Sequence, residues 1–411
     1  MNGGTNLPRV GGYNQAVVLD AIRIRGPVSR VELAPLTGLT NQTVSNVVRR
    51  LLAAGLVAES GFAPSGGGKR RTLLAPRPDG AFAAGVHLDP HAVVVAVVDL
   101  VGGVRASTRI ALEVPSDPED VVRRVSRALR RLTTRARIPA DRLLGVGVAA
   151  PGPIDSSEGA VVHPPNLPGW QLVPLVRMLE EATGMSVAME NDATAAAIGE
   201  RWIGGRERGG SFLFLYLGTG IGAGLVLGGT VIHGDTGNAG EFGHMSVQDG
   251  GLTCHCGNTD CLGPYLKRSA VIADYLAAIG PEEAAAVGAR GVSEEVDRDW
   301  ALLLDAVRRA DPAAVDAVRR SGRRLGQAAR SAVSLLDVGA VVLGGDGLTG
   351  IDRIMCEEVD AAVNGAAATG RPVRPVSVER SVMGETVGAV GAASLVLHGN
   401  YAPGWRMLTE A

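Results

Sequence analysis

Three of the four cysteines in this 411-residue chain lie within eight residues, in the segment LTCHCGNTDCL at 252–262. The spacing Cys254-x-Cys256-x4-Cys261 lacks the two-residue gap of a thioredoxin-type redox pair. Thiolates suit a soft divalent ion such as zinc, which takes four tetrahedral ligands that need not be adjacent in sequence. We predict that His244, ten residues upstream in GNAGEFGHM, is the fourth ligand. Four protein ligands would make the site closed and structural.

Disulfides, or reduced thiols without a metal, are the alternatives for this cluster. No basic N-terminal segment leads into an apolar stretch, and apolar runs such as AVVVAVV at 92–98 are far too short to span a bilayer. We therefore expect a cytoplasmic protein without a membrane segment, in a reducing compartment that disfavours disulfides. His255 lies inside the cluster, but neighbouring residues rarely bind one ion together. Cys356, alone in a helix-like segment, is expected to be a core thiol.

A second chemical signal is the glycine-rich run at 218–224 within SFLFLYLGTGIGAGLVLGG. It superficially resembles a dinucleotide fingerprint, which should open a helix. Here strand and hairpin residues follow it instead, at 225–232. The run therefore predicts a phosphate-facing hairpin, and a purely structural tight turn is the alternative.

Length and composition indicate a soluble protein of two or three domains, with 46% hydrophobic and 20% charged residues. The net charge of −2 is unevenly distributed. Residues 1–80 contain ten Arg and Lys against four acids, so they carry +6 and the remainder carries −8. A basic module on an acidic body predicts a polyanion-binding head.

The elements predicted for this head form a helix-turn-helix. NQAVVLDAIRI (14–24) has helical apolar spacing, and Ser29 with Glu32 reads as a capping box that opens the helix RVELAPL. Gly38 can take the left-handed conformation of the turn, and Thr40 caps a third helix, NQTVSNVVRRLLAAG. We expect its buried stripe to consist of Val44, Val47, Val48, Leu51 and Leu52.

The exposed face of this third helix has the short polar side chains, followed by arginine, that reading a DNA major groove requires. LVAES and RTLLA read as strands around SGGGKRR (65–71), a basic wing. The alternative is a small three-helix domain with a solvated basic loop. The residues that we predict to contact DNA are Asn41, Gln42, Thr43, Ser45 and Asn46 near bases, and Arg49, Lys69, Arg70 and Arg71 at phosphates or the minor groove.

The body is predicted to be α/β. Three strands within 85–114 precede the first helix (118–136), and further strands at 143–152 and 186–192 lead into a helix at 193–202. Three consecutive strands before a helix do not fit a dinucleotide fold, which alternates from the outset. They fit the RNase H-like lobe of actin-like phosphotransferases. Further along, 301–337 is predicted to be helical, and 338–350 is a strand that ends in a second glycine turn.

These segments occur in the order typical of one family. GVGVAAPGPID, PPNLPGW, ENDATAAAIGE, LGTGIGAGLVLGG, GNAGEFGHM, CHCGNTDCL and VVLGG resemble the motifs of ROK proteins (repressors, open reading frames and sugar kinases). The chain is most similar to the repressor branch, with its xylose and N-acetylglucosamine repressors, and the resemblance covers nearly the whole chain. It implies a winged helix-turn-helix followed by a two-lobed, actin-like ROK domain.

The resemblance also implies site residues. The family binds zinc through one His and three Cys, which correspond to His244, Cys254, Cys256 and Cys261. Its sugar pocket corresponds to Asn166, Asn191, Asp192, Glu241 and His244. In the family's kinases the Asp at position 192 is the general base that deprotonates the sugar hydroxyl, and the metal would hold His244 with its other ring nitrogen toward the ligand.

Three departures from the kinase pattern predict a non-catalytic sensor. The phosphate loop Asp-x-Gly-Gly-Thr is replaced by HLDPH at 87–91, where Pro90 removes an N–H donor. At the position where the kinases have a glutamate that binds sugar hydroxyls, this chain has Gly263. The second glycine turn contains Asp346, whose carboxylate would be unfavourable beside a nucleotide phosphate.

The predicted function is therefore a sequence-specific transcriptional regulator, most simply a repressor, that senses a sugar-like effector and acts as a homodimer or homotetramer on an inverted repeat of double-stranded DNA. The alternatives are an active sugar kinase with an appended winged helix, and a DNA-binding regulator without sugar control. The predicted domains are 1–78 for the DNA-binding head, 79–191 for the first lobe, completed by about 385–400, and 192–384 for the second lobe.

Overall fold

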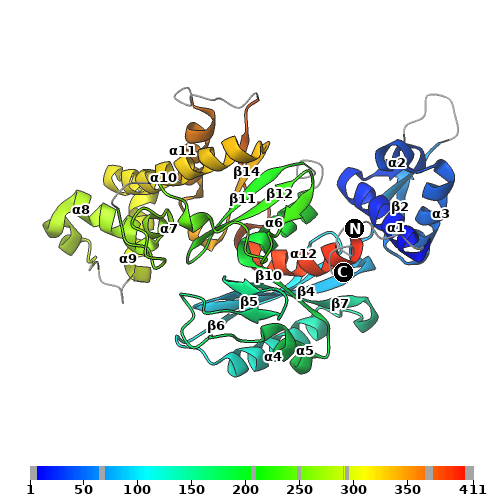
Figure 1. Cartoon of the computed structure of the whole chain (residues 1–411), viewed down its shortest axis with the longest axis horizontal. Helices are drawn as coiled ribbons and strands as arrows, with labels where there is room; N and C mark the ends of the chain where they lie inside the picture. Colours follow the sequence, from blue (N-terminus) through cyan, green and yellow to red (C-terminus); the bar gives the residue numbers. More distant parts are fainter. Residues whose placement is uncertain are drawn as a thin grey trace. The chain divides into compact units, whose positions relative to one another are not determined.

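The structure, a computed structural model, describes residues 7–63, 70–204, 210–247, 251–289, 291, 296–365 and 374–402. The chain divides into two compact units (Figure 1). Unit 1 comprises Met1–Gly209 and Gly388–Ala411, and unit 2 comprises Gly210–Val387. The second unit therefore begins later than the predicted residue 192, and the helix at 192–203 belongs to unit 1.

The N-terminal part of unit 1 is a winged helix. Its elements are α1 (Leu7–Arg25), β1 (Val28–Ser29), α2 (Arg30–Thr37), α3 (Asn41–Ala53), β2 (Val57–Phe62) and β3 (Thr72–Pro76). The strands form an antiparallel sheet in the order β1-β3-β2. The predicted helix-turn-helix and the two wing strands are thus confirmed, while the wing tip at 64–69 lies outside the described residues.

Local capping interactions define the two helices of the motif. The Glu32 carboxylate accepts hydrogen bonds from the N–H of Ser29, at 2.9 Å, and from its hydroxyl, so the predicted capping box is present. Gly38 ends α2 in the left-handed conformation, with φ 68°. The Thr40 hydroxyl caps α3 by accepting from the N–H of Thr43. Along α3 the predicted stripe is buried except for Leu52, which is half-buried because it lies at the helix end.

The remainder of unit 1 is built on a five-stranded sheet in the order β10-β7-β4-β5-β6. The strands β4, β5 and β6 pair antiparallel, whereas β4, β7 and β10 pair parallel. Helices α4 and α5 cover one face, and α6 and α12 cover the other (Figure 1). The bounds are β4 Phe82–Asp89, β5 Ala92–Asp99, β6 Val104–Ala111, α4 Pro118–Arg135, β7 Leu143–Ala150, β8 Ile154–Asp155, β9 Ala160–Val161, α5 Leu175–Thr183, β10 Val187–Asn191, α6 Asp192–Ile203 and α12 Val387–Tyr401.

The apolar helix α12 packs unusually close to the sheet. A Cβ added to Gly85 of β4 would lie 1.9 Å from the Ala389 carbonyl oxygen, and one added to Gly147 of β7 would lie 1.7 Å from that of Ala392. Only glycine allows this approach of backbone to backbone. The apolar surface of α12 is thereby buried in unit 1, and among the described residues no helix combines the length and the apolar character needed to cross a bilayer.

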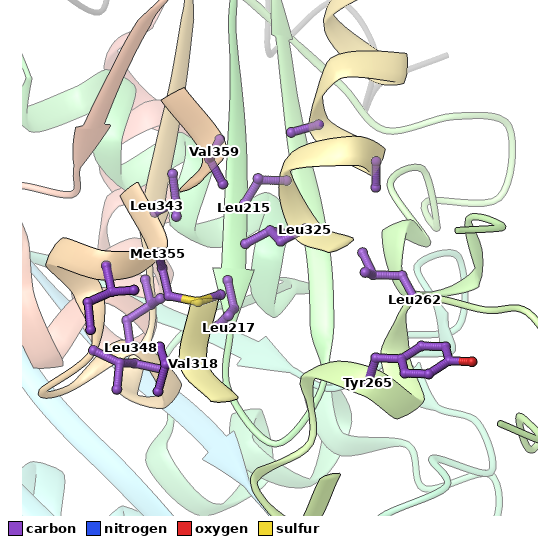
Figure 2. Packing of buried hydrophobic residues seen from close by; sticks show 14 of the residues in the cluster. Leu215, Leu217, Leu262, Tyr265, Val318, Leu325, Leu343, Leu348, Met355 and Val359 are labelled. Atoms are coloured by element: carbon purple, nitrogen blue, oxygen red, sulfur yellow. The ribbon is translucent and has the colours of Figure 1, made fainter. Parts of the chain in front are cut away.

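Unit 2 repeats the strand order of unit 1. Its sheet runs β13-β12-β11-β14-β15, with the first three strands antiparallel and β11, β14 and β15 parallel. The sheet packs through Leu215 and Leu343 against Leu325 of α10 and Met355 of α11 (Figure 2). The bounds are β11 Phe212–Leu217, β12 Ile221–Leu227, β13 Thr230–Ile232, α7 Gly263–Leu266, α8 Arg268–Ala286, α9 Val296–Arg308, α10 Pro312–Leu336, β14 Ala340–Gly344, α11 Asp352–Asn364 and β15 Ser377–Arg380.

The repeated order in two α/β units is the actin-like architecture that the sequence predicts. The single helical segment predicted over 301–337 is instead two helices, because Ala310 takes a left-handed φ of 59° and Asp311 caps α10. The glycine-rich run forms the turn between β11 and β12 rather than a helix start, as predicted.

The close packing of α12 gives a stability prediction. Replacing Gly147 by Ala would push a methyl group into the Ala392 carbonyl. We therefore expect the free energy of unfolding to fall by about 1–3 kcal/mol. Chemical denaturation monitored by circular dichroism measures this change. Gly210→Ala is the control, since no atom lies within 4 Å of its added Cβ. Equal stabilities of the two variants would contradict the packing described here.

Candidate functional site

The predicted metal ligands come together in unit 2. Single ligand atoms of His244, Cys254, Cys256 and Cys261 all lie within 4.8 Å of one another. The Nδ1 atom of His244 is 3.6 Å from the Cys254 sulfur and 3.8 Å from that of Cys261, and the Cys256 and Cys261 sulfurs are 3.6 Å apart. Ligands bound 2.0–2.3 Å from a tetrahedral ion lie about 3.3–3.8 Å apart. Three thiols and one imidazole at these separations fit a structural site for a soft divalent ion.

Backbone hydrogen bonds stabilise the segment 254–261, which we call the cysteine knuckle. The Cys254 N–H donates to the Asn258 carbonyl at 2.7 Å, and the Gly257 N–H donates to the Cys254 carbonyl at 2.9 Å. The segment around Cys261 pairs with the chain just after His244, where the Leu262 N–H donates to the Met245 carbonyl at 2.9 Å. The knuckle therefore braces the short 3-10 turn Phe242–His244 against the start of α7.

The thiols differ in acidity. The Asn258 N–H beside the exposed Cys256 lowers the pKa of that thiol to about 7, whereas burial raises the pKa of Cys261 to about 12. In the metal-free protein Cys261 would therefore stay protonated at neutral pH. A bound divalent ion would displace that proton, because thiolate is the form that binds metal.

His255 lies beside the ligand set. Its Nδ1 is 3.7 Å from the Cys254 sulfur, and its ring centroid is 5.1 Å from that of His244. Burial and the neighbouring His244 lower its pKa, so the ring is neutral at pH 7. It flanks the cluster and is not one of the four grouped ligand atoms.

The two ring nitrogens of His244 face different partners. While Nδ1 faces the thiols, Nε2 lies 3.9 Å from a carboxylate oxygen of Glu241. Glu241 is held in place by Gly240, whose positive φ of 93° lets the chain pass close to the Ala223 carbonyl of β12. Two of the predicted sugar ligands, Glu241 and His244, are therefore neighbours.

The other three predicted sugar ligands belong to unit 1. Asn191 caps α6, accepting a hydrogen bond from the Ala193 N–H at 3.0 Å, and the Asp192 carboxylate accepts from the same N–H at 2.7 Å. The positive end of the helix dipole stabilises that carboxylate. Asn166 lies in an exposed turn that Trp170 anchors by donating from its indole N–H to the Ser116 carbonyl. Asn191 and Asp192 are adjacent at one helix end, whereas Asn166 comes from a separate loop.

The β4–β5 hairpin has the segment that replaces the family's phosphate loop. At its tip the Asp89 carboxylate accepts a hydrogen bond from the N–H of His91 at 3.0 Å, and Pro90 has no N–H. His87 is buried, with its ring against Gly388 of α12, where an added Cβ would lie 2.4 Å from the ring. The tip therefore presents a carboxylate instead of free N–H donors.

The glycine turns of unit 2 are packed against each other. A Cβ on Gly345 would lie 1.9 Å from the Leu217 carbonyl oxygen, and one on Gly347 would lie 3.0 Å from that of Gly218. The turn at Gly218 and Gly220 lines a narrow pocket together with Leu266, Trp300 and Met355. Gly263 begins α7, where an added Cβ would lie 3.3 Å from the Gly243 carbonyl oxygen, so the turn before His244 approaches it closely.

The candidate DNA interface is the outer face of α3. Asn41, Gln42 and Arg49 are exposed, while Thr43, Ser45 and Asn46 are half-buried. The Thr43 hydroxyl is 2.9 Å from that of Thr40, so it is engaged in the helix cap. Of the wing cations, Arg70 and Arg71 are exposed, and Lys69 lies outside the described residues.

One buried contact was missed by the sequence analysis. Arg23 of α1 lies with its guanidinium 4.3 Å from the ring centroid of Trp202 in α6. The two residues are far apart in sequence and have no local motif, so only a three-dimensional structure could reveal the pair.

Comparison with known proteins agrees with this architecture. The ROK family model matches residues 83–398, and the MarR family model matches residues 7–71. A putative xylose repressor from Caldicellulosiruptor sp. is 30% identical over 80% of this chain and 82% of its own.

Two solved structures are also similar. A ROK family transcriptional regulator, described as a homologue of the E. coli MLC protein, superposes with a TM-score of 0.74 at 24% identity, over 97% of this chain and 98% of its own. A ROK glucokinase from Streptomyces griseus, in complex with glucose and AMPPNP, superposes with a TM-score of 0.63 at 29% identity, over 77% of this chain and 99% of its own.

The metal site gives a direct prediction. We expect the purified protein to contain about one divalent ion per chain, and Cys256→Ser to lose most of it, because a hydroxyl is a poor ligand for a soft ion. Elemental analysis by mass spectrometry measures the metal, and thermal unfolding should show a lower midpoint for the variant. Cys256 is exposed, so the change removes little packing. Cys356→Ser, outside the cluster, is the control; a metal content equal in both variants would rule out the assignment.

Proposed function

Because the chain belongs to the ROK family, we propose that it is a sugar-responsive transcriptional repressor that binds DNA and does not transfer phosphate. One observation carries the proposal: a winged helix, with a polar exposed face on α3, precedes the ROK domain. The likeness to a putative xylose repressor over 80% of this chain supports the same proposal. The protein would act in the cytoplasm, where the DNA is accessible.

On DNA, α3 would enter the major groove. Asn41 and Gln42 are exposed at the start of the helix, where a recognition helix contacts base edges, with Thr43, Ser45 and Asn46 beside them. Arg49, Arg70, Arg71 and Lys69 would neutralise phosphates or reach the minor groove. One half-site per head implies a homodimer, or a homotetramer, on an inverted repeat.

In the sensor domain, zinc would be held by His244, Cys254, Cys256 and Cys261. The ion's contribution would be structural, because His244 bound through Nδ1 would keep its Nε2 beside Glu241. A sugar has many hydroxyl groups that both donate and accept hydrogen bonds. Glu241, His244, Asn166, Asn191 and Asp192 supply complementary carboxylate, imidazole and amide groups.

Loss of phosphoryl transfer is supported by the β4–β5 hairpin. Phosphate binding needs free backbone N–H groups and a bound cation, whereas here Asp89 already accepts the His91 N–H and adds a negative charge. The carboxylate of Asp346 at the second glycine turn supports the same conclusion, because a negative charge there would repel a phosphate.

Two alternatives have specific support. An active sugar kinase is favoured by Asp192, which the family resemblance assigns to the base of the kinases, and by the likeness to the Streptomyces griseus glucokinase. A regulator without sugar control is favoured by Gly263, which offers no side chain to a sugar hydroxyl. The experiments below separate all three.

DNA recognition predicts different effects for two positions of α3. With a fragment of its own promoter, Gln42→Ala should weaken specific binding by about 1–3 kcal/mol and leave non-specific binding unchanged, since it contacts bases. Arg49→Ala should weaken specific and non-specific binding alike. It should also reduce the slope of log affinity against log salt concentration by about one. Electrophoretic mobility shifts at several salt concentrations measure these effects. Arg353→Ala, an exposed arginine of α11, is the control; absence of any specific, salt-sensitive shift by the wild-type protein would sink the repressor proposal.

Sugar binding without turnover is the second expectation. Titration calorimetry with D-xylose and with D-glucose should show binding that Asp192→Ala weakens at least tenfold, because one charged hydrogen-bond partner is lost. Coupled release of ADP from ATP with either sugar should stay at background. ADP release that Asp192→Asn abolishes would establish the kinase instead, and DNA binding without affinity for either sugar would favour the regulator without sugar control.

A further inference from the structure

Helix α1 of the DNA-binding head is joined to helix α6 by a buried charged cluster, which we call the α1–α6 junction: Asp20, Arg23, Arg201 and Trp202. The Arg23 side chain is only 4% exposed. Its guanidinium lies over the Trp202 ring and donates to the Trp202 carbonyl and, at 2.5 Å, to the Asp20 carboxylate. The second Asp20 oxygen lies 3.6 Å from the Arg201 guanidinium.

This cluster is more than incidental packing. Buried charges are tolerated only when paired, and Asp20 pairs with one arginine of each helix. The Arg23 guanidinium combines a flat stacking face with several directed N–H donors, which lysine cannot reproduce. The contact therefore fixes both the distance and the rotation of α1 relative to the end of α6.

A second connection lies beside the first. The Trp202 indole N–H donates to the Leu100 carbonyl at 2.9 Å, and the Leu100 N–H donates to the carbonyl of Pro78 at 3.0 Å. Pro78 begins the 3-10 turn Pro78–Gly80, through which the chain leaves the head. The end of α6 thus contacts the head where it begins, in α1, and where it ends, through Leu100.

The other end of α6 has the predicted ligand residues. Asn191 caps the helix and Asp192 is its first residue, while Arg201 and Trp202 lie in its last turn. Twelve residues of helix span about 18 Å. Residues 193–202 are all buried, and Ala195 packs so closely on α12 that a Cβ on Gly391 would lie 2.5 Å from its carbonyl oxygen. A helix this enclosed has little room to bend, so a shift at one end is expected to displace the other end as well.

We propose that Arg23 is a positioning residue that transmits the ligand state of Asn191 and Asp192, along α6, to the DNA-binding head. The inference rests on the proposed function, because it takes these two residues as part of the ligand site. A ligand that engages them in one position of α6 favours that position, and the junction imposes it on α1. Without Arg23 the head would still bind DNA but would no longer respond.

A merely structural contact would change stability alone, so the test measures coupling between the two ends of α6. Amide hydrogen exchange of the α1 segment 17–25 is followed in the full chain, for wild type, Asp192→Asn, Arg23→Gln and the double variant. We expect Asp192→Asn to change exchange of α1 at least fivefold in the wild-type background and less than twofold in the Arg23→Gln background. Equal changes in both backgrounds would overturn the proposal.

The matched control is Arg25→Gln, two residues further along α1, where the arginine is exposed. It removes the same charge from the same helix, and the response to Asp192→Asn should remain as in wild type. Loss of the response in Arg25→Gln as well would show that charge on α1, and not the junction, carries the effect. If Arg23→Gln does not fold, Arg23→Lys keeps the charge beside Asp20 and should give an intermediate response; a full response there would refute the need for the guanidinium.

The same variants are then measured for operator affinity with and without D-xylose or D-glucose. Arg23→Gln should bind the operator within about threefold of wild type but lose the sugar-dependent change in affinity. A sugar-dependent change equal to that of wild type would refute the proposal. Failure of the wild-type protein to bind DNA or sugar would refute the proposed function, and the exchange experiment, which needs neither, would still decide the role of Arg23.

Discussion

The architecture of unit 1 depends on how closely α12 approaches the sheet. Gly85 and Gly147 leave room for backbone carbonyls of α12 where any side chain would collide. Because α12 lies so close to the sheet, Gly391 of α12 comes into contact with the backbone of Ala195 in α6. This contact holds α6 beside α12. The direction of α6 determines where Asn191 and Asp192 are presented at one end and where Arg201 and Trp202 lie at the other. The three glycines thus allow the close packing that sets the direction of α6. That direction determines the positions of the candidate ligand residues and of the contact with the head.

In unit 2 a similar role falls to the cysteine knuckle. The sulfur atoms of Cys254 and Cys261 lie close to the Nδ1 atom of His244. With Nδ1 directed at the sulfur atoms, the opposite ring nitrogen, Nε2, faces Glu241. In unit 1, the tip of the β4–β5 hairpin has the carboxylate of Asp89, which accepts the His91 N–H, and Pro90, which has no N–H.

Much of this could be predicted from sequence where the determinant is local. The capping box of Ser29 and Glu32, the left-handed Gly38 and the spacing of the three cysteines each depend on a few neighbouring residues, and each is present. The break between α9 and α10 was missed although Asp311 and Pro312 are a typical start of a new helix, because the apolar spacing continues across it. The short helix α5 was missed as well. His244 was predicted as the fourth metal ligand because it lies ten residues upstream of Cys254 and matches the histidine of the family's motif. The contact of Arg23 with Trp202 joins ordinary residue types across 179 positions, so no pattern along the chain could predict it.

The position of α12 in the chain has a consequence for biosynthesis. Unit 2 is inserted between α6 and α12, so a ribosome makes the head, the first sheet and α6 roughly 200 residues before it completes α12. At 5–20 residues per second that interval lasts about 10–40 s. Throughout it, the sheet face around Gly85 and Gly147 lacks its covering helix, and α6 lacks the neighbour that holds it. The nascent chain can therefore fold its winged helix early, but unit 1 is completed only after unit 2 and α12 have been translated.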